Sequence, residues 1–330
     1  MDLSLKDRYT AARRRIIDDF FSRMNPMQKQ AVYTLNGPVL ILAGAGSGKT
    51  TVIINRIANM VLFGDAYHST WMPEQVTAED VAFLEEYADG ESWDSDRAFT
   101  LIRSHTVMPW NILAITFTNK AAGELRERLS AMLGRTADDV GASTFHSACV
   151  RILRREIERL GYGRSFAIYD TDDSLRVIKG ALKELNIDDK RFAPKGVLSA
   201  IGRAKDELLT PGGYEAGVGD DYYKQVVAKV YAIYQKQLQD ANAVDFDDII
   251  MLTVRLFKEF PEALDYYRNR FRYIMVDEYQ DTNRAQFELV RLLASESGNL
   301  CVVGDDDQSI YKFRGATIEN ILQFEDNFPG

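Results

Sequence analysis

A glycine-rich segment near the N-terminus has the composition and spacing needed to bind phosphate. Residues 38–51 read PVLILAGAGSGKTT, in which an apolar run from Val39 to Leu42 breaks into glycines and is followed by Lys-Thr. From Lys49 to Phe63 apolar side chains recur at helical spacing. A strand, a glycine turn and a helix in this order let backbone amides and the positive end of the helix converge on phosphate oxygens. The segment therefore predicts a phosphate-binding loop.

The side chains of this loop predict how it binds a nucleotide's phosphates and Mg²⁺. Lys49 brings a positive charge to the β- and γ-phosphates, and Thr50 offers a hydroxyl oxygen to Mg²⁺. Ala43 stands at the first glycine position of the usual pattern, where small size is the requirement. The loop residues expected to bind the nucleotide are Ala43, Gly44, Ala45, Gly46, Ser47, Gly48, Lys49, Thr50 and Thr51.

A glutamine shortly before the loop is a candidate for contact with the nucleobase. Asn25 suits a helix N-cap and Pro26 suits the first helical turn, which places Gln28 in the same helix. Its side-chain amide has both a donor and an acceptor, as pairing with a purine edge requires. The alternative is an exposed helix residue without a ligand, and the position just before the phosphate-binding loop favours the nucleotide contact.

A second apolar run, from Arg272 to Val276, ends in Asp277 and Glu278. There Asp277 is expected to complete the Mg²⁺ shell opposite Thr50, because carboxylate and hydroxyl oxygens suit a hard cation. Glu278 is expected to accept a proton from the water that attacks the γ-phosphate. An Asp-Glu pair after an apolar run is a simple turn in most proteins. Its combination with the phosphate-binding loop favours the catalytic interpretation.

The residues after the last predicted strand, Leu300 to Val303, combine a polar side chain with aromatic and basic neighbours. Gln308 is predicted to reach the γ-phosphate and so to link the nucleotide to these neighbours. Aromatic faces interleaved with cations stack bases and pair with phosphates of a single strand. Any one of these aromatics is more often a core residue, so the interpretation depends on several sharing one edge. Tyr311 and Phe313, with Lys312 and Arg314 among them, follow the last predicted strand. Phe117 and Phe246 lie at the ends or junctions of other predicted elements.

The charge distribution leaves a polyanionic partner open. The chain of 330 residues has a net charge of −9 and a pI near 5.1. Ten acidic residues and one base between residues 65 and 100 account for all of it. Between residues 151 and 205, by contrast, thirteen Lys or Arg face eight Asp or Glu. The acidity is therefore local, and the total does not argue against nucleic acid.

Cysteine and histidine usage indicates an intracellular protein without a disulfide framework. The two cysteines and three scattered histidines form no metal-binding pattern, so we expect reduced thiols and a cytoplasmic setting. The N-terminal residues 1–21 have no uninterrupted apolar core and read as an amphipathic helix rather than a signal peptide. No stretch approaches the length of a membrane span.

Strands alternating with helices predict an α/β fold with a parallel sheet covered on both faces. Further strands are expected at 112–117 and 141–145. From about residue 155 to 243 only amphipathic helices are expected, so the sheet is interrupted by an inserted all-helical domain. The expected helices of this domain are at 172–185, 194–207 and 220–240, separated by Pro194 and by a turn at 210–213. The acidic stretch 64–109 reads as a surface insertion with solvated charge and one short helix.

Seven segments in this order resemble the UvrD/Rep/PcrA family of superfamily 1 DNA helicases: NPMQKQAV, AGAGSGKT, ITFTNKAA, STFHS, VDFDD, VDEYQDTN and VGDDDQSIYKFRGA. The resemblance implies a RecA-like domain 1A at residues 1–154 and 244–330, with a helical domain 1B at 155–243. It also implies a 3′→5′ translocase and helicase on single-stranded DNA and on single-strand/duplex junctions. Repair or replication proteins would be its partners.

The resemblance assigns a role to each candidate residue. It implies that Gln28 binds adenine and that Lys49, Glu278 and Gln308 act in catalysis. Thr50 and Asp277 would hold Mg²⁺. The residues implied to line the DNA groove are Phe117, Thr144, His146, Phe246, Tyr311, Phe313 and Arg314.

Members of this family continue into a second RecA-like domain, whose arginines reach the γ-phosphate. The chain is accordingly expected to be the N-terminal half of a helicase, which binds ATP but hydrolyses it very slowly. Two alternatives stay open from the sequence. One is a non-catalytic, ATP-dependent module that binds DNA or protein, and the other is a phosphotransferase, which also uses a phosphate-binding loop.

Overall fold

The computed structural model describes residues 4–44, 46–305 and 324–328. Its strands are β1 (Val39–Leu42), β2 (Ile112–Thr116), β3 (Gly141–Thr144), β4 (Ala167–Ile168), β5 (Ala243–Val244), β6 (Tyr273–Val276) and β7 (Leu300–Gly304). Its α-helices are α1 (Leu5–Phe20), α2 (Pro26–Tyr33), α3 (Lys49–Leu62), α4 (Ala78–Ala88), α5 (Ser95–Ile102), α6 (Asn119–Leu133), α7 (Phe145–Glu156), α8 (Thr171–Glu184), α9 (Pro194–Asp206), α10 (Pro211–Ala216), α11 (Tyr222–Asp240), α12 (Phe246–Glu259), α13 (Pro261–Arg270), α14 (Arg284–Ala294) and α16 (Phe324–Asn327). Short 3₁₀ turns are η1 (Pro109–Asn111), η2 (Gly134–Asp139), η3 (Ile157–Leu160) and η4 (Tyr279–Asp281). None of the helices in these ranges is both long and apolar enough to cross a bilayer.

The main sheet is parallel and has five strands in the order β1-β7-β6-β2-β3. The order brings the strand before the glycine-rich loop beside β7, and β7 beside the strand that ends in Asp277. The strand ends are level, since Leu42 lies opposite Gly304 and Thr116 opposite Thr144. The segments that follow all five strands therefore begin at one edge of the sheet, as expected for a parallel α/β fold.

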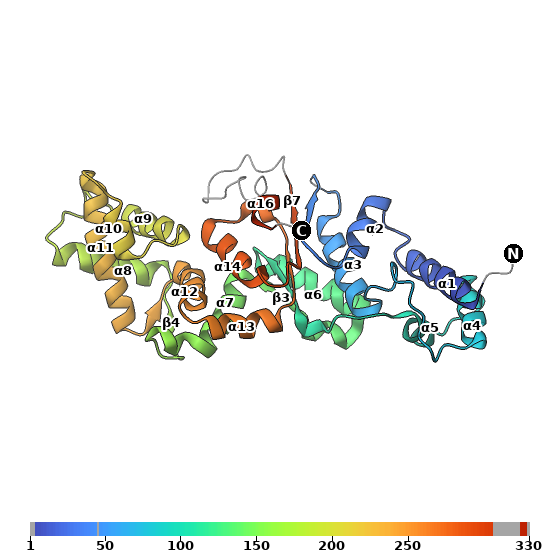
Figure 1. Cartoon of the computed structure of the whole chain (residues 1–330). Helices are drawn as coiled ribbons and strands as arrows, with labels where there is room; N and C mark the ends of the chain where they lie inside the picture. The colour runs from blue at the N-terminus through green and yellow to red at the C-terminus, as the bar shows by residue number, and fades with distance from the viewer. Residues whose placement is uncertain (1–3, 45, 306–323, 329–330) are drawn as a thin grey trace.

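Alternating side chains bury the two faces of this sheet in separate cores. Along β2, Leu113 and Ile115 join the core formed with α7, α12 and α14, whereas Ile112 and Ala114 join the core formed with α3 and α6. The same alternation runs along β6 and β7. A strand that is buried on both sides reads as a continuous apolar run, which is why the sequence revealed these strands clearly. Figure 1 shows the sheet in the middle of an elongated molecule.

The helices α8 to α11 form one end of the molecule around their own apolar cluster (Figure 1). Ile178, Val197 and Tyr231 are each fully buried in it. The expected helices agree with α8, α9 and α11 to within two residues. The turn expected at 210–213 is different, because the Thr210 hydroxyl caps the first turn of the short helix α10. A two-stranded parallel ribbon of β4 and β5, absent from the sequence prediction, brackets this helical region.

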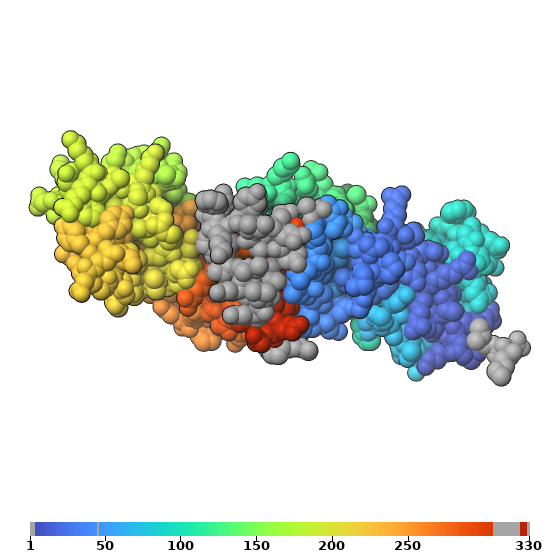
Figure 2. Space-filling model, turned by 90° about the horizontal axis from the view of Figure 1, so that it is seen from above, coloured from blue at the N-terminus to red at the C-terminus, as the bar shows by residue number. Residues whose placement is uncertain are grey.

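The acidic stretch 64–109 is more structured than expected, with two helices, α4 and α5, in place of one. Val81 and Leu84 of α4 are fully buried against α1, and Ala98 and Ile102 of α5 close the same apolar cluster. Acidic residues of this stretch also pair with α1, as in the ion pair between Glu85 and Arg8. Figure 2 shows the two segments side by side at the end opposite the helical region. The acidic stretch is therefore a small folded unit with charged residues on its outside, and it is not a solvated loop.

Candidate functional site

The glycine-rich loop connects β1 to the N-terminus of α3. Gly46 and Gly48 both have a left-handed backbone, with φ of 75° and 86°, which glycine adopts without steric cost. Gly48 is the N-cap of α3 and has no side chain to occupy the helix end, whose first residues are Lys49 and Thr50. A helix N-terminus left open in this way presents backbone amides and partial positive charge to an anion. The loop therefore has the geometry that phosphate binding requires.

Gln28 reaches from α2 to this loop. Its Oε1 accepts a hydrogen bond from the backbone N–H of Asn25 at 3.0 Å, and its Nε2 donates to the backbone carbonyl of Ser47 at 3.0 Å. A side chain on Gly48 would stand 3.3 Å from the Gln28 Nε2, so the amide lies directly beside the phosphate-binding turn. The structure thus brings Gln28 to the loop, and its contact with adenine stays a prediction.

Side chains from three neighbouring strand ends meet around Lys49. The Thr50 Oγ1 donates to the Asp277 Oδ2 at 2.9 Å. The Lys49 Nζ lies 3.0 Å from the Asp305 Oδ2 and 3.7 Å from the Glu278 Oε2. The loop, the end of β6 and the end of β7 therefore form one polar site.

Asp277 sits in an environment that suits a metal ligand. Burial raises the pKa of its carboxyl and the neighbouring charge of Glu278 raises it further, while the hydrogen bond from Thr50 opposes both. A bound divalent cation would oppose this rise in pKa, because a nearby positive charge favours the carboxylate. Carboxylate and hydroxyl oxygens are also the donors that Mg²⁺ prefers. Thr50 and Asp277 thus fit the Mg²⁺ site predicted for them.

Aromatic residues follow β2 and β3, the two strands at the far end of the strand order from β1. Phe117 is half-buried and meets the buried Phe145 edge-on, with ring centroids 5.5 Å apart. Thr144 is buried and caps α7, since its Oγ1 accepts the Ser147 amide at 3.2 Å. The structure places both residues at the edge of the sheet where its strands end, and the contact shown for Thr144 is that of a helix cap.

His146 and Phe246 form a stacked aromatic pair, although they lie on different helices, α7 and α12. Their ring centroids are 3.7 Å apart at an interplanar angle of 20°, and Phe246 is 57% exposed. Burial lowers the pKa of His146 to about 4, partly opposed by a hydrogen bond with the Phe246 backbone, so the ring is neutral at pH 7. An uncharged, partly open aromatic stack of this kind can extend onto a nucleobase.

Comparison with known proteins fits this arrangement. Residues 24–69 and 95–329 match the family model described as the UvrD/REP helicase N-terminal domain. The chain belongs to this family. It is 49% identical over 314 residues to the ATP-dependent DNA helicase PcrA of Bacillus subtilis (strain 168). The matched region is 95% of the chain and 37% of the relative. The PcrA of Staphylococcus aureus (strain Mu50) is 47% identical over 308 residues, or 93% of the chain and 36% of the relative.

The chain therefore spans little more than a third of the length of these relatives. Residues 70–94, which include α4, are the internal part that the UvrD/REP family model leaves out. The candidate residues Ala45, Gln308, Tyr311, Phe313 and Arg314 lie outside the residues that the structure describes. Their predicted roles stay predictions.

Sequence reasoning missed Gln280, which joins two strand ends in this UvrD/REP domain. Its Nε2 donates to the Glu278 Oε2 at 2.7 Å, and its Oε1 accepts the Asp305 amide at 3.0 Å. Gln280 is 2% exposed. Glu278 has a left-handed backbone with φ of 52°, an uncommon conformation for a residue with a side chain, so neighbours must hold it there. The sequence signal was its place in the segment VDEYQDTN, two residues after Glu278, a position to which no role was assigned.

Arg128 is a second residue that the sequence did not reveal. It extends from α6 and its Nη2 donates to the Thr51 Oγ1 at 2.8 Å, which adds positive charge beside the first turn of α3. Nothing in the pattern of α6 distinguished this arginine from its basic neighbours. It lies next to the predicted nucleotide contact Thr51.

Proposed function

We propose that residues 1–330 form the ATP-binding and DNA-binding part of a DNA helicase that translocates 3′→5′ on single-stranded DNA. The observation that carries the proposal is the convergence of Lys49, Thr50, Asp277 and Glu278 at one edge of the sheet. The family and the names of its relatives support helicase activity. The direction of movement rests on the resemblance of the sequence motifs alone.

The ATP site is proposed to hold the triphosphate against the loop and the end of α3. Lys49 pairs with the β- and γ-phosphates, and Thr50 and Asp277 supply oxygen ligands for Mg²⁺. When bound, Mg²⁺ neutralises charge on the phosphates. Glu278, whose carboxylate is near Lys49 and held by Gln280, accepts the proton of the attacking water.

The DNA surface is proposed to lie beyond β2 and β3, beside the nucleotide site. Bases stack on the outer face of the pair formed by His146 and Phe246, and Phe117 lines the same edge. Each stacked base contributes roughly 1–3 kcal/mol without preference for sequence. In this proposal residues 1–154 and 244–330 are domain 1A and residues 155–243 are domain 1B.

Residues 1–330 on their own are proposed to bind ATP and hydrolyse it slowly. In related NTPases an arginine that reaches the transferred phosphoryl contributes about 10³–10⁵ in rate. The motif resemblance assigns such arginines to a second RecA-like domain. Partners are proposed to be single-stranded DNA, single-strand/duplex junctions and repair or replication proteins. A cytoplasmic setting is proposed because Cys149 and Cys301 are both buried and free of disulfides.

The test is DNA-stimulated ATPase activity in the full-length protein that contains this chain. We expect stimulation by oligo-dT in the wild type and none in Lys49→Ala, since the substitution removes the positive charge that pairs with the phosphates. Full ATPase activity in Lys49→Ala would contradict the proposed site. ATP binding without any DNA-stimulated hydrolysis in the wild type would instead favour a non-catalytic binding module.

A further inference from the structure

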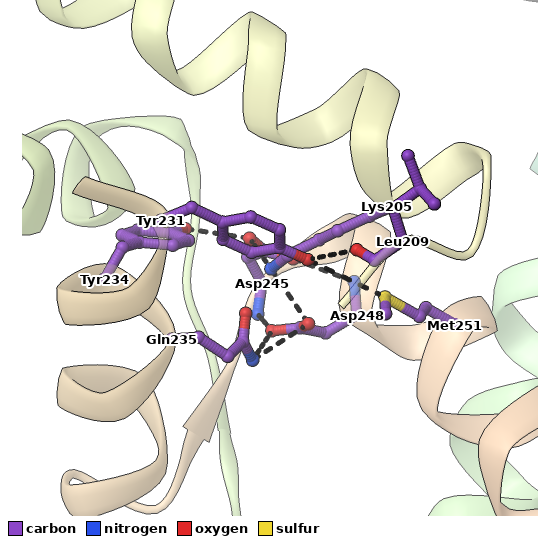
Figure 3. Close-up of polar contacts among 8 residues, drawn as sticks. All are labelled: Lys205, Leu209, Tyr231, Tyr234, Gln235, Asp245, Asp248 and Met251. Atoms are coloured by element: carbon purple, nitrogen blue, oxygen red, sulfur yellow. Dashed lines mark hydrogen bonds and ion pairs between the residues drawn. The ribbon is translucent and has the colours of Figure 1, made fainter. Parts of the chain in front are cut away.

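A buried lysine links the helical region to the helix that carries Phe246. Lys205, near the end of α9, is 0% exposed, and its Nζ lies 2.6 Å from the Asp245 Oδ2 and 2.8 Å from the Asp248 Oδ1. Figure 3 shows the lysine side chain extending from α9 between these carboxylates. A long cationic side chain without solvent contact is rare unless charged partners hold it, so this one has a defined position.

The two carboxylates are the cap of α12. Asp245 is its N-cap and accepts the Asp248 amide at 2.8 Å, while Asp248 accepts the Asp245 amide at 3.1 Å. This reciprocal pattern is a capping box, which fixes the direction in which a helix begins. The next residue after Asp245 is Phe246, so the backbone that Lys205 holds is the one from which the exposed ring projects.

Residues of α11 complete the cluster around the lysine (Figure 3). The Tyr234 hydroxyl donates to the Asp245 Oδ2 at 2.8 Å, and the Gln235 Nε2 donates to the Asp248 Oδ1 at 3.1 Å. The Lys205 Nζ also lies over the Tyr234 ring, 5.1 Å from its centroid. Helices α9 and α11 of the inserted region thus both contact the first turn of α12.

We propose that Lys205 is a positioning residue for DNA binding: through Asp245 and Asp248 it orients Phe246 against His146 so that the pair can stack on a base. The inference rests on the proposed function, because it requires that this pair contacts DNA. It assigns the inserted helical region a role at the DNA surface that does not depend on direct contact with the strand.

The neighbouring residue offers a matched control. Asp206 follows Lys205 on α9 but contacts another helix, since its Oδ1 accepts the Asn283 Nδ2 at 2.7 Å at the start of α14. Asp206→Asn keeps an acceptor at this place and leaves every contact of Lys205, Asp245 and Asp248 intact, although it removes a negative charge that repels Asp247 in the first turn of α12. A general effect of disturbing the end of α9 would appear in both variants, and an effect specific to Phe246 in only one.

The experiment measures binding of residues 1–330 to oligo-dT that contains one 2-aminopurine, whose fluorescence is quenched by stacking. Variants are Lys205→Met, the milder Tyr234→Phe, Asp206→Asn, and Phe246→Ala to set the scale. We expect Phe246→Ala and Lys205→Met to weaken binding about 5- to 150-fold, the range of one stacked base, and to reduce quenching at saturation. Tyr234→Phe should shift both readouts in the same direction by less, and Asp206→Asn should change neither.

The outcomes separate the inference from the proposed function. All binding is measured well below the unfolding midpoint of each variant, and affinity for a fluorescent ATP analogue reports on the fold. If Lys205→Met and Tyr234→Phe lower thermal stability but leave affinity and quenching unchanged, Lys205 is structural only and the inference is wrong. If Lys205→Met does not fold, Tyr234→Phe alone decides. If Phe246→Ala binds and quenches like the wild type, the proposed DNA surface itself is wrong.

Discussion

The hydroxyl of Thr50 lies 2.9 Å from a carboxylate oxygen of Asp277, although 227 positions separate the two residues in the chain. The contact exists because β1 and β6 both flank β7 and all three strands end at one edge of the sheet. It joins the phosphate-binding loop to the acidic strand end in a single site. The nucleotide chemistry proposed for this chain depends on that junction.

Gln280→Ala is expected to slow hydrolysis without weakening ATP binding. Glu278 would lose the 2.7 Å hydrogen bond that holds its carboxylate, and small misplacement of a catalytic group costs up to about 100-fold in rate. Single-turnover hydrolysis with excess protein should fall by about 10- to 100-fold. The dissociation constant for ATP should stay within about twofold, because Gln280 does not contact the loop.

Gln235→Ala is the matched control for this prediction. Gln235 also donates its partly buried amide to a carboxylate, that of Asp248, but in the helical region. Hydrolysis should be unaffected in this control. Equal losses in the two variants would show that removal of either amide acts through stability alone, and the positioning of Glu278 by Gln280 would be rejected.

Leu84→Ala is expected to destabilise the unit formed by α1, α4 and α5. Leu84 is 0% exposed in its apolar cluster, and loss of a buried leucine side chain typically costs about 2–5 kcal/mol. The control Trp93→Ala, at a residue that is 86% exposed, should change stability by less than about 0.5 kcal/mol. Denaturant unfolding of both variants is the measurement. A Leu84→Ala protein as stable as the wild type would mean that the acidic stretch is a loosely attached excursion.

Asp206→Asn is expected to stabilise the protein above pH 7 but not near pH 4. Burial raises the pKa of Asp206 to about 7, and the charges of Asp247 and Glu207 add to the effect. Because the folded-state pKa is above that of the unfolded chain, the protonated carboxyl contributes stability that is lost as pH rises from about 4 to 7. Asparagine has no proton to lose and still accepts the hydrogen bond from Asn283.

The size of this pH effect is limited by partial exposure of the site. With allowance for solvent screening we expect a gain of about 1–2 kcal/mol for Asp206→Asn at pH 8. Unfolding by denaturant at pH 5 and pH 8 measures it in both proteins. A difference between them that does not change with pH would show that Asp206 is already charged in the folded protein at pH 5.

His146 is expected to remain uncharged throughout the physiological range. Burial lowers the pKa of its ring to about 4, well below the value of about 6.5 for a free histidine. In an NMR titration its ring resonances should stay constant from pH 8 to about pH 5. A His146 midpoint near 6.5 would contradict the buried stack with Phe246.

The sequence was sufficient for the sheet and for the residues at its edge. Strands such as Ile112–Thr116 are buried on both faces, so their apolar runs were visible without knowledge of their neighbours. The parallel arrangement then required Thr50 and the acidic pair after β6 to share an edge. The roles of Gln308 and of the aromatic residues after it fall outside the described residues and stay predictions.

Features that depend on a distant partner could not be predicted. Lys205 lies in the helix expected at 194–207, and nothing near it in the sequence indicates its burial, because its carboxylate partner Asp245 is 40 positions further on. The role of Gln280 could not be predicted for the same reason, since it accepts a hydrogen bond from the backbone N–H of Asp305, 25 positions away. The sequence of the acidic stretch predicts solvated charge, because its many acidic residues outnumber the few apolar residues through which α4 packs against α1. Only the tertiary structure supplies these partners.

The central claim is that one site binds the triphosphate through Lys49 and its Mg²⁺ through Thr50 and Asp277. Equilibrium binding of ATP to residues 1–330, with and without Mg²⁺, tests it most directly in the wild type, Lys49→Ala and Asp277→Asn. We predict that Mg²⁺ tightens binding to the wild type, that Asp277→Asn loses this dependence, and that Lys49→Ala binds at least about tenfold more weakly. The same affinity and the same Mg²⁺ dependence in all three proteins would contradict the account.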